Sequence, residues 1–392
     1  MIDKQPIIDT SQSKELHFLL TLLREENRFE EIISLKEIDW NHFLELVKHH
    51  RVCPLIYIRL KDTPDAVPPH VIKALFQEYK KNTFKMLQLT GEMETLDKVF
   101  NENDIETLFL KGPPVAYDLF ENISLRMSKD LDILVREEEL EKAESILFSL
   151  GYEKEEIPTV LNEIKWRHHH IAYYHPGKKI QVEVHWRLHP RSMKRTKFEQ
   201  LWNGKRESQL TKHPISFMGT EDLLLYLISH GARHGWFRLR WLKDIDQMVR
   251  NKDINYVRFR ALAIKHQQKH LVGQAFQLAT LLFQTPVHEE LQDVVNTRRV
   301  HQLAKKAIPY IKEIVPLHVH PRPENLEHSY KKYALSIKSN REKLLFFIIL
   351  FYPNTLDQET VKLPNSLHFL YFVLRPVLSL FRKVKKPVIH AE

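Results

Sequence analysis

The pattern of apolar positions divides the chain into helical ends and a different central segment. Residues 14–60 contain two amphipathic runs with helical spacing, the second with Asp39 as its predicted N-cap. The proline-rich stretch 61–70 interrupts this pattern, and a long helix is then expected to end near Asn101. From Thr220 to about residue 316 the apolar positions again have helical spacing. The sequence therefore predicts helical regions on both sides of a central segment.

Short runs with strand character follow residue 105. Residues 105–110 form a buried apolar run, and residues 126–135, RMSKDLDILV, predict a second strand. A charged helix is expected from about residue 137 to 150. Residues 168–188 then predict a hairpin with its turn at His175–Lys178. Strands and helices interleaved in this way between two helical regions predict an α+β fold.

Three acidic side chains occupy the polar faces of these strands. Asp130 and Asp132 are two residues apart, so in a strand they point to the same face and repel each other. Glu183 lies on the polar face of the second hairpin strand, together with Gln181 and His185. If the strands are adjacent, the three carboxylates converge, and such oxygen ligands suit Mg²⁺ or Mn²⁺ together with substrate phosphates. An exposed strand edge is the alternative explanation, and it would need no cation.

Composition and charge narrow the class of partner. The chain has 392 residues, with 59 Lys and Arg against 50 Asp and Glu, which gives a formal net charge of +9. This excess favours an anionic partner such as a nucleotide, a nucleic acid or an anionic membrane surface. The single cysteine, Cys53, excludes an intramolecular disulfide and a cysteine-based zinc cluster.

Targeting signals are weak in this sequence. The longest apolar run, residues 344–352, is far shorter than the roughly 20 residues that span a bilayer. Residues 1–18 lack the apolar core of a signal peptide. We therefore expect a cytoplasmic protein without stable membrane insertion.

Histidine is abundant, with 23 residues, and two clusters need an explanation. The side chains of residues 168–170, all histidine, alternate across a predicted strand, so at most two can share a site. His230 and His234 have the spacing of zinc ligands on a helix, but Gly231 stands where the metalloprotease pattern requires Glu. We therefore do not predict a zinc protease.

Four short motifs occur in a fixed order: LKG at 110–112, DLDILV at 130–135, VEVHW at 182–186 and HGARHGW at 230–236. Together they resemble a bacterial family of uncharacterised nucleotidyltransferases within the DNA polymerase beta-like superfamily. The resemblance implies a small mixed β-sheet nucleotidyltransferase core embedded between an N-terminal helical region and a C-terminal helical domain. The corresponding predicted division is 1–90 for the N-terminal region, 91–215 for the core, 216–320 for the C-terminal domain and 321–392 for an extension.

The resemblance also assigns roles to the three carboxylates. Asp130 and Asp132 become metal ligands, and Glu183 becomes the third catalytic carboxylate, which holds one metal and helps to deprotonate the acceptor. Because Asp130 and Asp132 repel each other, we expect Asp132→Asn to stabilise the metal-free protein slightly. Apart from the resemblance, we expect His234 and Asp244 to shape the acceptor side of the cleft. His185, which shares a face with Glu183, is expected on that side as well and near the metals.

The expected nucleotide contacts depart from the superfamily pattern. Gly112 stands where the superfamily has a glycine-serine pair, but Pro113 follows it and offers no N–H to a phosphate. Lys111 and Arg126 are our candidates for supplying the missing positive charge.

The predicted function is metal-dependent transfer of a nucleoside monophosphate from an NTP, with ATP among the candidates, and release of pyrophosphate. The acceptor could be a small molecule, a peptide, a protein or an RNA, and the oligomeric state is not predicted. Two alternatives stay open at this point. The missing serine favours a non-catalytic nucleotide-binding or interaction module, and the net charge favours a basic nucleic-acid-binding protein.

Overall fold

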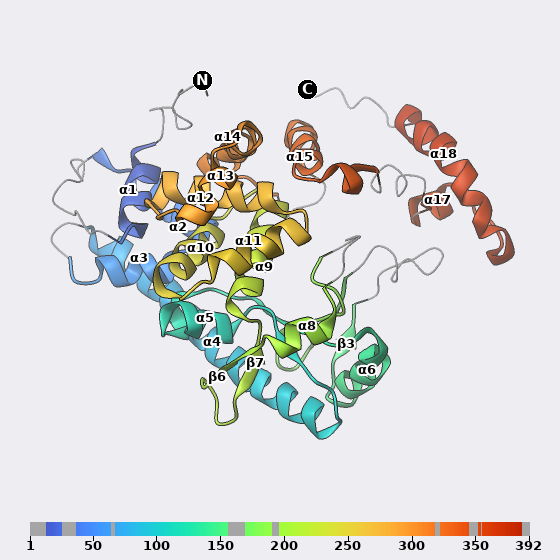
Figure 1. The fold of residues 1–392 in the computed structure, drawn as a ribbon, viewed down its shortest axis with the longest axis horizontal. Helices are drawn as coiled ribbons and strands as arrows, with labels where there is room; N and C mark the ends of the chain where they lie inside the picture. The colour runs from blue at the N-terminus through green and yellow to red at the C-terminus, as the bar shows by residue number, and fades with distance from the viewer. Residues whose placement is uncertain are drawn as a thin grey trace.

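The structure, a computed structural model, has the predicted α+β fold, with one mixed sheet and helical regions at both ends of the chain (Figure 1). It describes residues 13–25, 37–63, 67–155, 169–189, 196–317, 322–344, 352–353 and 355–385. The apolar run at 344–352 lies outside these residues except for its two ends.

Four helices form the N-terminal region: α1 (Lys14–Leu23), α2 (Trp40–His50), α3 (Cys53–Leu60) and α4 (Pro69–Glu102). Asp39 caps α2 as predicted, since its side chain accepts hydrogen bonds from the backbone N–H groups of Asn41 and His42. The long helix α4 ends one residue beyond the predicted position.

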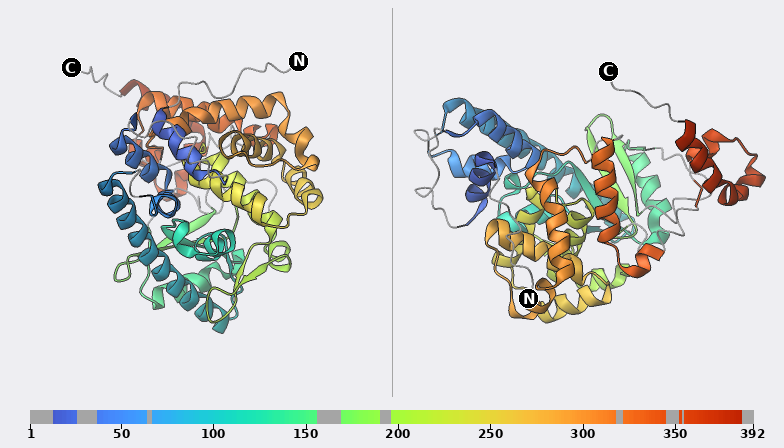
Figure 2. Two further views of the ribbon diagram at one scale, coloured as in Figure 1. Left: turned by 90° about the vertical axis from the view of Figure 1, so that its left-hand side faces the viewer. Right: turned by 90° about the horizontal axis from the view of Figure 1, so that it is seen from above.

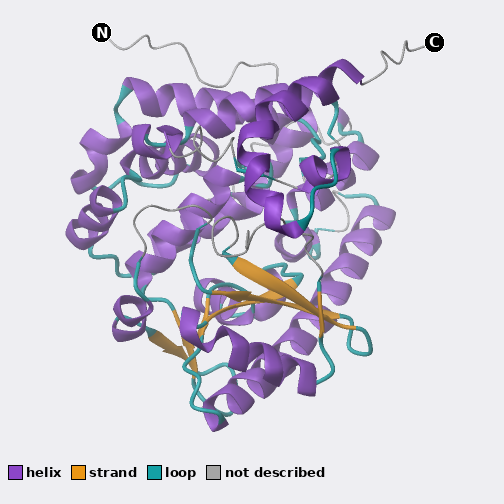
Figure 3. Ribbon diagram, turned by 90° about the vertical axis from the view of Figure 1, so that its right-hand side faces the viewer, coloured by secondary structure: helices purple, strands orange, loops and turns teal. Residues whose placement is uncertain are grey.

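The sheet has seven strands in the order β3-β4-β5-β2-β1-β7-β6. Figure 3 shows the strands in orange, with helices around them. The pairs β2–β5 and β1–β7 are parallel and the other neighbours are antiparallel, so the sheet is mixed. The predicted hairpin is β4–β5. The strand bounds are β1 Leu108–Phe109, β2 Asp130–Leu134, β3 Glu153–Lys154, β4 His170–His175, β5 Ile180–His185, β6 Arg206–Ser208 and β7 Ile215–Phe217.

Short helices connect the strands, and a bundle follows the last one. The connecting helices are α5 (Pro113–Phe120), α6 (Leu140–Ser149) and α8 (Phe198–Asn203). The bundle comprises α9 (Thr220–Arg233), α10 (Leu239–Asn251), α11 (Tyr256–Lys265), α12 (Lys269–Phe283), α13 (Gln292–Val295), α14 (Arg298–Lys312) and α15 (Glu324–Ser336). Helices α17 (Thr355–Thr360) and α18 (Tyr371–Lys385) lie beside this body (Figures 1 and 2). No helix in the described ranges has the length and apolar character needed to cross a membrane.

One hydrophobic core extends from Leu16 in α1 through the sheet to Ile337 after α15. A separate small cluster in α18, formed by Tyr371 and Leu378, packs against Leu363 and Leu374. The core thus joins the three regions that the sequence suggests before residue 320, and their boundaries stay predictions.

Glycine is required where α9 turns into α10. A Cβ atom on Gly231 would lie 2.2 Å from the ring of Trp236, which is fully buried. Trp236 itself has a φ of 57°, and the preceding Gly235 a φ of 66°. The HGARHGW motif therefore builds the tight turn between α9 and α10.

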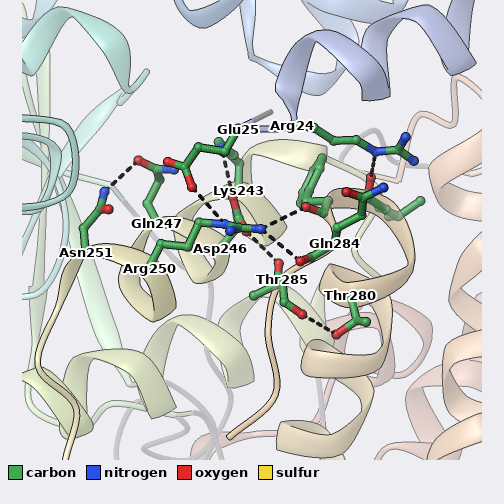
Figure 4. A network of polar contacts seen from close by, with 12 residues as sticks. Arg24, Glu25, Lys243, Asp246, Gln247, Arg250, Asn251, Thr280, Gln284 and Thr285 are labelled. Carbon is green, nitrogen blue, oxygen red and sulfur yellow. Dashed lines mark hydrogen bonds and ion pairs between the residues drawn. The ribbon is translucent and has the colours of Figure 1, made fainter. Parts of the chain in front are cut away.

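Helix α10 is held in place by a polar network around Asp246 (Figure 4). The buried carboxylate of Asp246 accepts hydrogen bonds from Lys243 at 2.7 Å, Arg250 at 2.8 Å and Thr285 at 2.7 Å. Arg250 also donates to the carbonyl oxygen of Gln284 at 3.0 Å. These contacts tie α10 to the end of α12, and they fix the helix that carries several side chains of the site described below.

Acid is expected to destabilise the fold through His50. Its ring is fully buried, Nδ1 accepts a hydrogen bond from the Leu239 N–H at 3.3 Å, and burial lowers the pKa of His50 to about 3. The unfolded chain takes up a proton near pH 6.5, so stability falls as the pH drops from 6.5 towards 3. Between pH 6.5 and 5 this one group should cost about 2 kcal/mol.

The test is chemical denaturation of wild type and His50→Asn at several pH values between 5 and 7.5. The variant should lose about 2 kcal/mol less than wild type across this range. His70→Asn, at an exposed position on α4, is the control. Parallel pH profiles for wild type and His50→Asn would contradict the prediction.

Candidate functional site

A cavity of about 400 Å³ lies where the polar face of β2 and β5 meets α9 and α10. Its lining is dominated by ionisable groups: three carboxylates, six basic side chains and five imidazoles. These are Asp130, Asp132, Glu183; Arg51, Lys111, Lys129, Arg233, Arg238, Arg240; and His169, His170, His185, His230, His234. The aromatic rings of Tyr226, Phe237 and Trp241 complete the wall.

Strand register brings the acidic residues together. In the parallel pair β2–β5, Asp132 lies opposite Glu183 and Asp130 lies opposite Gln181. In the antiparallel pair β4–β5, His170 lies opposite His185. Because residues two apart share a face, Asp130, Asp132, Glu183 and His185 all project from the same face of the sheet.

Asp132 is the centre of the polar contacts. Its side chain is fully buried, and Oδ1 lies 2.8 Å from Lys111 Nζ and 3.2 Å from His185 Nε2. His185 Nε2 is also 3.3 Å from Glu183 Oε2, so one nitrogen bridges two carboxylates. The second oxygen of Asp132, Oδ2, is buried and has no hydrogen-bond partner among the described residues.

Burial and neighbouring charges shift the pKa values of Asp132 and Asp130 in opposite directions. Burial would raise the pKa of Asp132, but Lys111 and His185 hold that pKa well below its ordinary value. The pKa of Asp130 is instead raised, first by burial and then by the Asp132 carboxylate. The same carboxylates raise the pKa of Lys111 despite its burial. Asp132 is therefore ionised and paired, whereas Asp130 is the carboxylate that an added cation would stabilise most.

The donor atoms fit a divalent cation. Asp132, Glu183 and His185 each offer one ligand atom, and these three atoms lie within 4.8 Å of one another. His169, His170 and His185 form a second group of the same size. The buried, unpartnered Asp132 Oδ2 is an acceptor that a bound cation would satisfy. Asp130 lines the same cavity without belonging to either group.

The basic side chains leave the cavity with an excess of positive charge. Arg240 donates from Nη1 to the carbonyl oxygen of Met127 at 2.9 Å, and burial followed by the nearby Arg126 lowers its pKa to about 9. Arg233 contacts ring nitrogens of His169 at 3.3 Å and His230 at 3.4 Å. Neither guanidinium has a carboxylate partner within the described part of the chain. Arg240 is buried and Arg233 is partly buried, and cations in such places without a counter-ion favour an anionic ligand.

Arg126 and Asp244, predicted to lie at the nucleotide and on the acceptor side, pair with each other in the core. Their side chains are each 1% exposed and form a two-bond ion pair, with Nε–Oδ1 and Nη2–Oδ2 distances of 3.0 Å. Neither side chain lines the cavity. The geometry therefore makes them a structural link between the segment before β2 and α10, and Arg240 is the guanidinium that faces the cavity from this side.

The remaining predicted residues are close to the cavity. His234 lines it, with its ring stacked 5.2 Å from that of Trp241. Gly112 has a φ of 87° and caps α5, whose first two positions are Pro113 and Pro114. Because neither proline has an N–H, the start of α5 is a poor phosphate cradle. This geometry agrees with the departure noted in the sequence.

Several residues that line the cavity were not predicted from the sequence. Arg233 lies inside the HGARHGW motif, and its place on the same helix face as His230 was a usable signal. Arg51 ends α2 in the left-handed region, with a φ of 55°, and reaches the cavity from the N-terminal region. No local pattern connects Arg51 or Arg240 to the DLDILV strand, because their proximity arises from tertiary packing.

Comparison with known families agrees with this architecture. Residues 36–284 match the sequence model of a family described as uncharacterised nucleotidyltransferases. The match includes every residue that lines the cavity. The chain belongs to this family, and the general class of its reaction is nucleotidyl transfer. A search of curated proteins gives no match.

Proposed function

We propose that the chain is a metal-dependent enzyme that transfers a nucleoside monophosphate from an NTP to an acceptor and releases pyrophosphate. Family membership supports the transferase class. The observation that carries the proposal is the pairing of Asp132 with Glu183 across β2 and β5, beside guanidinium groups without carboxylate partners in the described ranges. Carboxylates and cations in one cavity suit a metal–polyphosphate complex.

Different cavity residues would bind the metal, bind the phosphates and accept the proton in such a transfer. Asp132, Glu183 and Asp130 would hold the divalent metal, which supplies charge stabilisation at the phosphates when bound. Arg233 and Arg240 bind the phosphate oxygens and so orient the α-phosphorus. The acceptor oxygen forms a bond to this phosphorus, the bond to the β-phosphate oxygen breaks, and the proton of the acceptor passes to Glu183.

A nucleotide-binding module without turnover is the second candidate. The Lys111–Asp132 ion pair already neutralises a predicted metal ligand, and the start of α5 lacks two N–H groups. Both observations favour binding over catalysis. The nucleic-acid-binding alternative is supported only by the net charge of +9.

The experiment is transfer of label from each of the four α-³²P-labelled NTPs to acceptors in fractionated lysate, with Mg²⁺ or Mn²⁺. We expect a labelled product and stoichiometric pyrophosphate. Arg240→Gln should reduce the rate at least ~10-fold, whereas Arg260→Gln, in a surface ion pair with Asp293, should leave it unchanged. Nucleotide binding without pyrophosphate would establish the second candidate. If neither nucleotide binding nor transfer is detected, both candidate functions are contradicted.

A further inference from the structure

We infer that the metal centre is a mixed carboxylate–imidazole site in which His185 Nε2 is a direct ligand, so that the protein binds a first-row transition-metal ion in preference to Mg²⁺. The inference deepens the proposed function and rests on it for the place of the metal. It adds the ligand and the ion preference, neither of which the transferase class requires.

The spacing of the donor atoms carries the first step. In octahedral coordination with bonds of about 2.1 Å, neighbouring ligand atoms are about 3 Å apart. His185 Nε2 lies 3.2 Å from Asp132 Oδ1 and 3.3 Å from Glu183 Oε2. A cation that contacts both carboxylates at this point therefore also meets the imidazole nitrogen.

The second observation concerns the hydrogen-bond partners of His185 and Asp132. The His185 side chain is 2% exposed, and its other nitrogen, Nδ1, has no hydrogen-bond partner in the part of the chain that the structure describes. The polar contacts of this ring therefore run through Nε2 to the two carboxylates. Asp132 Oδ2 is buried and unpartnered in the same part of the chain. The other unpartnered atoms of the lining, on Arg233, Arg240 and Trp241, are N–H donors, whereas Asp132 Oδ2 is an acceptor that a cation would satisfy.

Further imidazoles adjoin this point. His170 Nε2 is 3.7 Å from Glu183 Oε2, and the ring centroids of His170 and His185 are 4.9 Å apart. The ring of His169 is 4.5 Å from that of His170. His185 is common to the acidic group and to the three-histidine group.

The chemistry of these ligands determines which metal ion the site prefers. Mg²⁺ takes oxygen ligands and retains its waters, so an imidazole in its first shell is unfavourable. Imidazole suits first-row transition metals, whose affinities rise from Mn²⁺ to Cu²⁺. Carboxylates together with one imidazole are therefore expected to select Mn²⁺ over Mg²⁺, and Co²⁺ or Zn²⁺ over Mn²⁺.

The test uses the full chain without nucleotide and Mn²⁺ as the probe. Titration followed by electron paramagnetic resonance gives the Mn²⁺ affinity, competition gives that of Mg²⁺, and pulsed measurement detects ¹⁴N coupled to the bound Mn²⁺. We expect Mn²⁺ to bind at least ~10-fold more tightly than Mg²⁺, with an imidazole ¹⁴N coupling. His185→Gln should abolish that coupling and weaken Mn²⁺ binding at least ~10-fold, while leaving Mg²⁺ binding within about twofold.

His234→Gln is the matched control, because His234 lines the same cavity outside both ligand groups. It should retain the ¹⁴N coupling. If His185→Gln does not fold, His169→Gln and His170→Gln decide the question, because each should retain the coupling when His185 is the ligand. Bound Mn²⁺ without ¹⁴N coupling, or equal affinities for Mn²⁺ and Mg²⁺, would overturn the inference. This test does not measure turnover, so its failure can be distinguished from failure of the proposed function. Nucleotidyl transfer with Mg²⁺ in a protein that shows no ¹⁴N coupling would support the function and overturn the inference.

Discussion

Asp132→Asn is expected to reduce nucleotidyl transfer by at least ~10²-fold, the scale on which loss of one preorganised electrostatic group acts. The amide keeps the shape of the side chain but removes the charge that faces Lys111 Nζ at 2.8 Å and His185 Nε2 at 3.2 Å. The variant also loses an anionic ligand for the metal. Single-turnover transfer with saturating NTP measures the effect on the chemical step.

The same variant should be less stable than wild type without metal. The sequence led us to expect slight stabilisation from relief of carboxylate repulsion, but the structure shows Asp132 as the paired member of the two, with its pKa lowered. Removing its charge leaves Lys111 buried without its partner, at a cost of about 1–3 kcal/mol. The repulsion argument applies to Asp130, whose pKa is raised, so Asp130→Asn should stabilise the metal-free protein slightly.

Thermal melts with and without Mn²⁺ and NTP separate these effects. Wild type should gain stability from the ligands through binding linkage, and Asp132→Asn should gain much less. Equal ligand-induced stabilisation of the two proteins would mean that the metal binds elsewhere. A metal-free Asp132→Asn protein that melts above wild type would restore the repulsion argument for this residue.

Strand periodicity explains why the acidic part of the site could be predicted. Asp130, Asp132 and Glu183 stand at alternating positions in apolar runs, and a period of two fixes the face on which each side chain lies. The period does not fix the register, so the direct opposition of Asp132 and Glu183 is known only from the structure. The Asp39 cap is likewise local, because its bonds reach only two and three residues along the chain.

Contacts between distant segments could not be predicted in this way. Arg126 precedes the DLDILV strand and looked like a phosphate ligand, but its partner Asp244 is 118 residues away. No local pattern distinguishes a guanidinium that faces a cavity from one that is paired in the core. The same holds for Lys111, whose pairing with Asp132 depends on how β1 lies beside β2.

Asp244→Asn is expected to destabilise the protein by about 3–5 kcal/mol, the range for breaking a buried ion pair on one side. Both partners are 1% exposed, and Arg126 Nη1 already lacks a hydrogen-bond partner among the described residues. The variant leaves a buried guanidinium facing a neutral amide. Denaturation in urea at pH 7 measures the loss, and Asp293→Asn, in an exposed pair with Arg260, should cost less than about 1 kcal/mol.

Replacing both partners separates structure from ligand binding. Arg126→Met combined with Asp244→Leu removes both charges, so the double variant should recover most of the stability that Asp244→Asn loses. Because neither side chain lines the cavity, the KM for NTP in the folded double variant should stay within about threefold of wild type, a difference below 1 kcal/mol. Arg240→Gln, by contrast, should raise the KM or lower kcat in a protein of near wild-type stability. If the double variant is stable but its KM rises at least ~10-fold, Arg126 contacts the nucleotide after all, and the phosphate-binding role that we predicted from the sequence replaces the structural one.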